Sequence, residues 1–267
     1  LWEGLGYYSR ARNLQRAARV ICTQYGGEVP TSREQLLALP GIGPYTAGAV
    51  ASIAGGERCP AVDGNVLRVL SRLFARTWDI RAQRTKRQAE EELTAAMSEQ
   101  SPGDCNQALM ELGAVVCLPN GEPLCGSCPI APLCRAHADG AEQQYPVRAP
   151  KKQRPVERRA VFLLWNNGRL ALRKRPETGL LAGLWEFPNC PEGGDPAEQL
   201  GVPLRNMRQT GRAKHIFTHL EWHMTGWTAQ TEETGYFTWV TPQQLERDIA
   251  LPSAFRAFRR MALTTED

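Results

Sequence analysis

Hydrophobic residues in the first half of the chain recur at the spacing of amphipathic helices. In residues 8–25 this spacing stops at Gly26-Gly27, a pair that can cap the C-terminal end of a helix. The same period predicts five further helices: one from a Thr31 or Ser32 cap to Leu39, one over about 44–55, one directly after Asp63, and two over 82–98 and 104–116. We therefore expect the first 135 residues to be nearly all α-helical.

Beyond about residue 159 the hydrophobic period becomes two, which is typical of β-strands. The segments AVFLLW and RLALRKR flank Asn166-Asn167-Gly168, and this combination predicts a β-hairpin. The segments HIFTHLEWHMTGWTAQ and GYFTWV are predicted to be further strands, and residues 242–263 are predicted to supply closing helices. The second half is therefore predicted to be an α+β domain.

A polar, proline-containing segment separates the two patterns. Its composition is that of a linker. The sequence thus predicts a helical domain over 1–137, a linker over 138–158 and an α+β domain over 159–267.

The composition fits a globular protein of two domains. The chain has 267 residues, of which 42% are hydrophobic, and its net charge of +4 permits a nucleic-acid partner without requiring one. No apolar run is long enough to span a membrane and no targeting signal is visible, so we expect a cytoplasmic protein with no membrane partner. Because the chain opens at Leu1 in what reads as the middle of an element, we expect its N-terminal segment to be missing.

The stretch LPGIGPYTAG places a tight turn directly before a helix. Gly41 and Gly43 allow the backbone to come close to a ligand, and the N–H groups at the start of the following helix suit a phosphate. A helix–hairpin–helix of this kind grips a DNA backbone without reading its sequence. A plain inter-helix turn is the alternative, and the small residues after the turn favour DNA.

Four cysteines gather within 18 residues, in the pattern C-x7-C-x2-C-x5-C. Cys117, Cys125, Cys128 and Cys134 have the chemistry to hold either tetrahedral zinc or an iron–sulfur cluster. Structural zinc sites usually contain two close pairs and only Cys125/Cys128 is one, but zinc remains open. The four scattered cysteines are predicted to be small core residues: Cys22, Cys59, Cys105 and Cys190.

Asp63 stands where a helix begins, so it is predicted to be an N-cap. A carboxylate held rigidly in this way stays ionised. Such a charge is what stabilises a positively charged sugar when a glycosidic bond breaks. The structural and the catalytic interpretation are compatible.

The motifs GLGYYSRARNL, LPGIGPYTAGAVASIA, VDGNVLRVLSRL and NQALMELGAVVC, followed by the cysteine run, resemble the endonuclease III superfamily of DNA glycosylases in identity and order. Within it, the chain is similar to the MutY-type adenine DNA glycosylases over essentially its whole length. RPETGLLAGLWEFP and HIFTHLEWHM resemble the C-terminal domain of that family, which has a MutT-like (Nudix) fold.

This resemblance implies a base-excision-repair enzyme. It would hydrolyse the N-glycosidic bond of adenine paired with 8-oxoguanine or guanine in double-stranded DNA. It also implies a [4Fe-4S] cluster on Cys117, Cys125, Cys128 and Cys134, and we expect a monomer.

Three residues receive catalytic roles from the resemblance. Asp63 would stabilise the oxocarbenium ion, and Asn65 would be its hydrogen-bonding partner near the sugar. Bifunctional relatives carry a lysine at the position of Tyr45, which attacks the sugar as an amine. Tyr45 has no amine, so a monofunctional glycosylase is implied; on sequence alone it would be a packing aromatic.

The resemblance also assigns DNA contacts. Gln107 would touch the flipped adenine, and Tyr7 would wedge beside 8-oxoguanine. Phe217, Thr218 and His219 align with the loop of the second domain that recognises 8-oxoguanine. Without the resemblance, Gln107 would be interpreted as an ordinary polar helix residue and Tyr7 as a half-buried core tyrosine. Residues 217–219 would be interpreted as part of a strand.

Three departures from the family pattern accompany the resemblance. The catalytic glutamate of the family belongs to a segment before Leu1, so the chain as written is expected to be inactive. The first cysteine gap holds seven residues where the family has six, and Leu67 stands where many relatives have lysine.

Three rival functions remain open on the sequence. A bifunctional lyase is disfavoured by Tyr45 and by the second domain, and a DNA-binding module with structural zinc would be colourless. A Nudix hydrolase would need Arg-Glu and Glu-Glu pairs on one helix, which NCPEGGDPAEQLG lacks.

Overall fold

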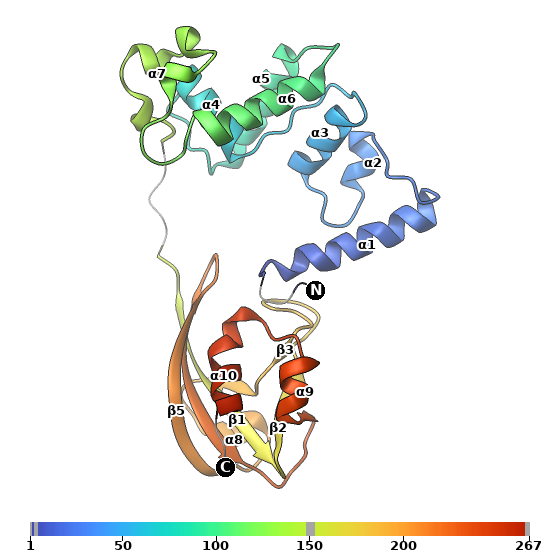
Figure 1. Cartoon of the computed structure of the whole chain (residues 1–267), viewed down its shortest axis with the longest axis vertical. Helices are drawn as coiled ribbons and strands as arrows, with labels where there is room; N and C mark the ends of the chain where they lie inside the picture. The colour runs from blue at the N-terminus through green and yellow to red at the C-terminus, as the bar shows by residue number, and fades with distance from the viewer. Residues whose placement is uncertain (1, 3–4, 148–152, 265–267) are drawn as a thin grey trace. The chain divides into compact units, whose positions relative to one another are not determined.

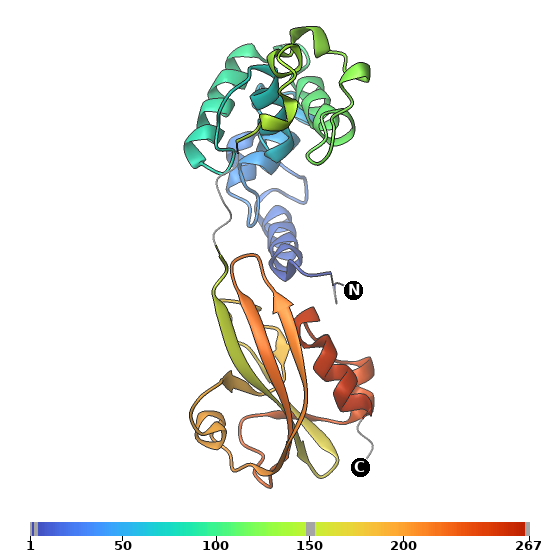
Figure 2. The same cartoon turned by 90° about the vertical axis from the view of Figure 1, so that its left-hand side faces the viewer.

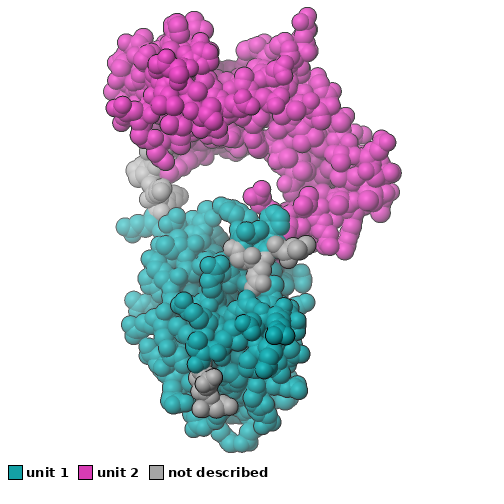
Figure 3. Space-filling view, viewed as in Figure 1, with its two compact units in different colours: residues 1–8, 152–267 teal, residues 9–151 magenta. Residues whose placement is uncertain are grey.

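The computed structural model describes residues 2, 5–147 and 153–264. The chain divides into two compact units, residues 9–151 and residues 1–8 together with 152–267 (Figure 3). The first unit is helical and the second is α+β, so the predicted fold class is confirmed. Among the described residues, no helix combines the length and apolar character needed to cross a membrane.

The helices of the first unit follow the predicted order (Figure 1). Their bounds are α1 Tyr8–Gln24, α2 Arg33–Leu37, α3 Pro44–Ile53, α4 Gly64–Leu73, α5 Gln83–Ala96, α6 Pro102–Glu111 and α7 Arg135–Ala138. A π-helical turn, η1 (Leu112–Val116), continues α6, and short 3-10 turns follow at Cys125–Ser127, Ala131–Leu133 and Glu142–Gln144.

Local chemistry sets the helix starts. Ser32 caps α2, because its hydroxyl accepts a hydrogen bond from the Gln35 amide. Pro44 opens α3, where its fixed φ suits the first helical position and its missing N–H costs nothing. Asp63 caps α4, as the sequence predicted.

Two small cores hold the helical unit together. One joins α1, α2 and α3 around Leu36, and the other joins α4 and α5 around Val66 and Leu67. Cys59 lies in the first core, as predicted. Cys22 is exposed and Cys105 only partly buried, so their prediction as core residues was wrong for Cys22 and too strong for Cys105. Cys22 is exposed because Ile21 lies on the inward face of α1, and the next residue along a helix points about 100° away from it.

The helical unit continues past the predicted boundary at residue 137. The guanidinium of Arg72 donates from Nε to the carbonyls of Glu142 at 2.9 Å and Tyr145 at 3.0 Å. These bonds tie the polar segment to α4, so its first ten residues are part of the fold rather than a linker. Residues 148–152 of the predicted linker lie outside the described residues.

The second unit is built on a mixed sheet in the order β3-β2-β1-β6-β5, with β4 on β1 and β7 on β2. Its strands are β1 Val156–Asn166, β2 Arg169–Lys174, β3 Trp185–Glu186, β4 Asn189–Pro191, β5 Arg205–Ile216, β6 Glu221–Gln230 and β7 Thr238–Val240. The predicted hairpin is confirmed, since Asn166 pairs with Arg169 across a turn in which Asn167 and Gly168 both have positive φ.

One strand prediction was wrong. HIFTHLEWHMTGWTAQ is not one strand but the end of β5, a turn over 217–220 and β6. The Phe217 amide donates to the Leu220 carbonyl at 2.9 Å and closes this turn. The segment contains no glycine or proline before residue 226, so its composition gave no turn signal, and only the family resemblance placed a loop at residues 217–219.

Helices cover both faces of the sheet (Figure 2). On one face, α9 (Pro242–Arg247) and α10 (Arg256–Thr264) bury Leu245 and Phe258 against β1, β2 and β6. On the other, α8 (Pro196–Leu200) buries Leu200 beside Phe162. Residues 242–263 therefore supply the closing helices, as predicted.

Candidate functional site

Asp63 is fixed at the N-terminus of α4 by three hydrogen bonds. Its Oδ1 accepts from the amides of Asn65 and Val66, both at 2.8 Å, and its Oδ2 accepts from Asn65 Nδ2 at 3.0 Å. The positive end of the helix dipole also favours a negative charge there. The side chain of Asp63 is therefore held in one orientation, and the predicted pairing with Asn65 is present.

Asn65 links Asp63 to the cysteine segment through Arg68. The Nη2 of Arg68, which is 4% exposed, donates to Asn65 Oδ1 at 2.9 Å and to the Gly113 carbonyl at 2.6 Å. Its Nε donates to the Cys117 carbonyl at 2.8 Å. One buried guanidinium thus joins the start of α4 to the segment that carries the first predicted metal ligand.

The close approach of η1 to α4 depends on Gly113. A Cβ at Gly113 would lie 2.6 Å from the Cβ of Asn65, which real side chains do not tolerate. The π-helical turn over Leu112–Val116 places this glycine against α4. Such turns are frequent at functional sites.

Tyr45 lies near Asp63 on the first turn of α3. Its hydroxyl donates to the Met110 sulfur at 3.1 Å. Burial, and then the negative charge of Asp63, raise the pKa of Tyr45 above its ordinary value, so the phenol is neutral at physiological pH. The structure therefore brings together Asp63, Asn65 and Tyr45, the three residues predicted to be catalytic.

Adjacent amides on α6 have opposite environments. Gln107, the predicted adenine contact, is exposed, whereas Asn106 is fully buried. Asn106 accepts from the Ala61 amide at 2.9 Å and donates to Ser52 Oγ at 2.8 Å and to the Cys59 carbonyl at 2.9 Å. It fixes the segment that leads into Asp63, a role that sequence reasoning missed.

The hairpin glycines play different structural parts. Gly41 has φ +80°, and a Cβ there would lie 2.5 Å from the Cβ of Asn13. Gly43 is the N-cap of α3 with φ −97°, and a Cβ there would meet nothing within 4 Å. The fold therefore requires glycine at position 41, while at position 43 its absence of a side chain only leaves the helix N-terminus open.

This difference predicts unequal effects on stability. Gly41→Ala is expected to lower the free energy of unfolding of the helical unit by about 1–3 kcal/mol, through its left-handed φ and the clash with Asn13. Gly43→Ala is the matched control and should change it by less than about 0.5 kcal/mol. Urea unfolding of both variants measures the contrast, and equal effects would contradict this account of Gly41.

The four predicted metal ligands line one cavity of the helical unit. Cys117, Cys125, Cys128 and Cys134 meet there with apolar side chains, among them Val69, Leu112 and Ile130. The Nη1 of Arg72 donates to the Cys117 sulfur at 3.2 Å, and its Nε and carbonyl hold the surrounding loop. A set of four thiols in an apolar setting with one cationic donor fits an iron–sulfur cluster.

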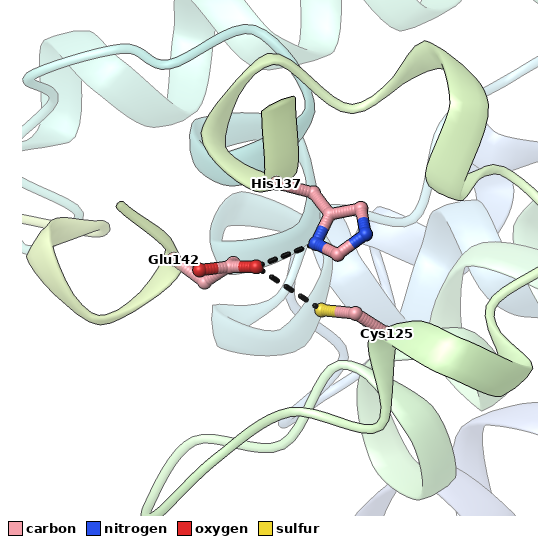
Figure 4. Close-up of side chains that lie close together, drawn as sticks. All are labelled: Cys125, His137 and Glu142. Carbon is pink, nitrogen blue, oxygen red and sulfur yellow. Dashed lines mark hydrogen bonds and ion pairs between the residues drawn. The ribbon is translucent and has the colours of Figure 1, made fainter. Parts of the chain in front are cut away.

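A second donor set overlaps this cavity (Figure 4). Glu142 Oε1 lies 2.6 Å from His137 Nδ1 and accepts from the Cys125 sulfur at 3.6 Å. Burial, and then the Glu142 carboxylate, raise the pKa of the Cys125 thiol to about 11. Because Cys125 belongs to both sets, a zinc ion on Cys125, His137 and Glu142 and a cluster on four cysteines exclude one another.

The predicted recognition residues lie on the turn between β5 and β6. The Phe217 ring packs edge-on against Trp222 and His215, with centroids 5.0 Å and 4.6 Å away. Phe217 therefore anchors the turn, while Thr218 and His219 are exposed at its tip. Arg154 steadies the turn from outside by donating to the Thr218 carbonyl at 3.2 Å.

Tyr7 belongs to the unit that contains residues 152–267 rather than to the helical unit. Tyr7 has φ +46° and is 70% exposed, so its alternative interpretation as a half-buried core tyrosine is wrong.

Among the described residues, the helix that follows LLAGLWEFP carries no pair of acidic side chains. α8 has five residues and a single acidic side chain, Glu198. Glu186 is buried and already paired with Arg173 at 2.8 Å and Arg175 at 2.6 Å. Glu198 and Glu186 therefore do not form the pair of carboxylates that would bind Mg²⁺ for hydrolysis of a nucleotide.

Comparisons with known proteins give a match in the helical unit and a match in the α+β unit. Residues 24–53 match the helix-hairpin-helix motif and residues 160–261 match the NUDIX domain. Adenine DNA glycosylase of Homo sapiens is 36% identical over 281 residues, covering 83% of this chain and 51% of the relative. That of Arabidopsis thaliana is 41% identical over 255 residues, covering 82% of this chain and 40% of the relative.

A solved complex of endonuclease III with DNA is 33% identical, with a TM-score of 0.44 and coverage of 51% of this chain and 62% of that chain. The chain spans about half the length of the curated relatives it matches.

Proposed function

This chain belongs with the adenine DNA glycosylases, to which it is homologous over about four fifths of its length, and from this premise we propose that the full-length protein removes adenine from mispairs in duplex DNA. The substrate would be adenine opposite 8-oxoguanine or guanine. The reaction would be hydrolysis of the N-glycosidic bond without strand cleavage.

The fixed carboxylate of Asp63 is the observation that carries this proposal. Loss of adenine leaves a sugar with oxocarbenium character, and a preorganised negative charge beside it lowers the barrier. Two backbone amides and Asn65 hold Asp63 in place, so no reorganisation is needed when the cation forms. Asp63 stabilises the cation until water adds.

Tyr45 supports hydrolysis rather than lyase chemistry. A phenol near Asp63 cannot form the Schiff base with the sugar that an amine forms. Its bond to Met110 directs the hydroxyl toward the protein.

The hairpin and α6 would hold the DNA. Adenine must leave the base stack to be reached, so the backbone on either side has to be gripped. The open N-terminus of α3 behind Gly43 offers amide donors to a phosphate, and exposed Gln107 would contact the flipped base. Tyr7, Phe217, Thr218 and His219 would contribute to recognition of the opposite base, with Phe217 acting as the anchor of its turn.

We assign the cysteine cavity to a [4Fe-4S] cluster held by Cys117, Cys125, Cys128 and Cys134. When bound, a cluster of this kind braces the loop that Arg68 joins to the start of α4. Leu118 lies in the seven-residue gap between Cys117 and Cys125. Its carbonyl accepts a hydrogen bond from Arg72 Nη1 at 2.9 Å.

The cofactor assignment makes a direct prediction. Protein purified without oxygen should be brown and contain iron and acid-labile sulfide, and Cys128→Ser should lose most of both. Cys22→Ser, at an exposed position outside the cavity, is the control. A colourless protein with one zinc ion, lost in Glu142→Gln, would instead support the Cys125, His137 and Glu142 set.

Tyr45 supplies a second prediction. The wild-type protein should form no covalent complex with substrate DNA under borohydride, because no amine stands at position 45. Tyr45→Lys should yield a trappable complex, and Tyr45→Phe should not. Trapping by the wild-type protein would favour a bifunctional lyase.

The activity itself is tested by a single-turnover assay. Full-length protein is incubated with a duplex carrying one 8-oxoguanine·adenine pair, and free adenine is measured together with strand integrity. We expect adenine release and an intact strand. Release of another base, or none from folded protein with its cofactor, would overturn the proposal.

A further inference from the structure

The second unit carries a basic basin on one face of its sheet. Side chains from three neighbouring strands line it, together with Glu192 after β4. The residues that matter here are Arg158 on β1, His223 and Thr225 on β6, and Arg212 and Lys214 on β5. With a volume of about 580 Å³, the basin is larger than a single inorganic ion needs.

Strand register places these side chains on one face. Arg158 is the partner of His223, which is in turn the partner of Lys214, and Arg212 is the partner of Thr225. Residues directly opposite in a sheet project to the same side. Arg158 and Arg212 stand two strands and two residues apart, which is about 12 Å at a strand spacing of about 4.8 Å and a rise of about 3.4 Å per residue.

The charges of the basin are unevenly satisfied. Lys214 Nζ lies 2.6 Å from Glu221, and Thr225 donates to Glu192 at 2.6 Å. In the described part of the chain, the exposed guanidinium groups of Arg158 and Arg212 have no hydrogen bond or ion pair. Two exposed guanidinium groups without a partner keep their N–H donors available, so each can bind an anion such as a phosphate.

We propose that the basic basin binds the sugar–phosphate backbone of a DNA strand, with Arg158 and Arg212 each donating to a phosphate. The guanidinium fork matches two phosphate oxygens. The basin is open, and the imidazole of His223 is the only aromatic ring among the residues that line it, so it offers no platform of the kind that holds a free nucleotide by its base. Such contacts set position rather than sequence.

The basin lies on the two strands that the turn at 217–220 connects. β5 ends two residues after Lys214, and β6 begins two residues before His223. A strand held in the basin would therefore pass beside exposed Thr218 and His219 on the same unit. Only the passage of the strand beside Thr218 and His219 rests on the proposed function, because binding of the DNA backbone does not require a mispair.

The test compares two double variants of equal charge in the full chain. Arg158→Gln/Arg212→Gln empties the basin of its free cations. Arg169→Gln/Arg205→Gln removes two exposed arginines at the far end of the same sheet, where Arg205 only pairs with exposed Glu232. Fluorescence anisotropy with an undamaged duplex is measured over a range of salt concentrations, after circular dichroism has shown equal melting temperatures.

The basin variant should bind about tenfold more weakly, and the slope of log affinity against log salt should fall in magnitude by about 1.8, or about 0.9 for each lost phosphate contact. The control should change the slope by less than half as much. Equal slopes in both variants, or an unchanged slope in the basin variant, would overturn the proposal.

The proposed function is judged separately, by the preference of the wild-type protein for an 8-oxoguanine·adenine duplex over the undamaged one. If that preference is absent while the slope still falls, the basin stands and the base specificity is wrong.

Discussion

Asp63→Asn in the full-length protein is expected to slow single-turnover release of adenine by about 10²–10³-fold, the usual cost of losing one preorganised charge or donor at a transition state. Asparagine caps helices as well as aspartate does, so the start of α4 should survive the change. What is lost is the negative charge that, under the proposed function, would face the sugar cation. Melting temperature should therefore stay nearly constant while the rate collapses.

The matched control for Asp63 is Asp104→Asn. Asp104 is an exposed carboxylate in the first turn of α6, so it has a similar helical position and the same charge. Its substitution should leave the rate within about twofold, as is usual for a surface residue away from the reaction. If Asp63→Asn kept its rate within tenfold of the wild type, Asp63 would be only a helix cap and the mechanism would need another stabilising charge.

Asn106→Leu is expected to have the largest effect on stability. The change leaves the buried Ala61 amide and the Cys59 carbonyl without their partners, and removes the bond to Ser52. Each of these two unsatisfied buried groups costs about 1–3 kcal/mol, so the helical unit should lose about 2–6 kcal/mol. Since Asn106 is fully buried, the stranded Ala61 amide and Cys59 carbonyl cannot bond to water instead.

The neighbouring amide provides the control. Gln107→Leu makes the same chemical change at an exposed position of the same helix and should alter the free energy of unfolding by less than about 0.5 kcal/mol. Urea denaturation followed by helical circular dichroism measures both variants. Equal destabilisation by both would mean that helix propensity, rather than the buried amide, sets the cost.

The elements with strong local signals could be predicted well. Ser32 and Asp63 predicted the starts of α2 and α4, and Asn167-Gly168 predicted the β1–β2 hairpin. β5 carried no such signal. Its edge position leaves residues 205–209 exposed, and exposure alternates only from Gly211 to Ile216, so the first half of β5 shows no period of two.

The candidate site divides in the same way. Asp63 and the four cysteines could be named as candidates from residue types at short spacing, whereas Asn65 and Tyr45 could be named only from the family resemblance. Arg68, Arg72, Asn106 and Gly113 could not be named. Each acts across 45 residues or more, and long-range hydrogen bonds leave no local pattern.

The sequence by itself therefore determined the helical and α+β halves, the helix caps, the hairpins and the types of residue available for chemistry. These follow from neighbouring positions, whose spacing and backbone preferences act within a few residues. Only the tertiary structure decided that Asn106 rather than Gln107 is buried, that Phe217 anchors its turn, and that Arg158 and Arg212 share one face. Those outcomes depend on which distant segment packs against each side chain, and the packing of the whole unit settles that.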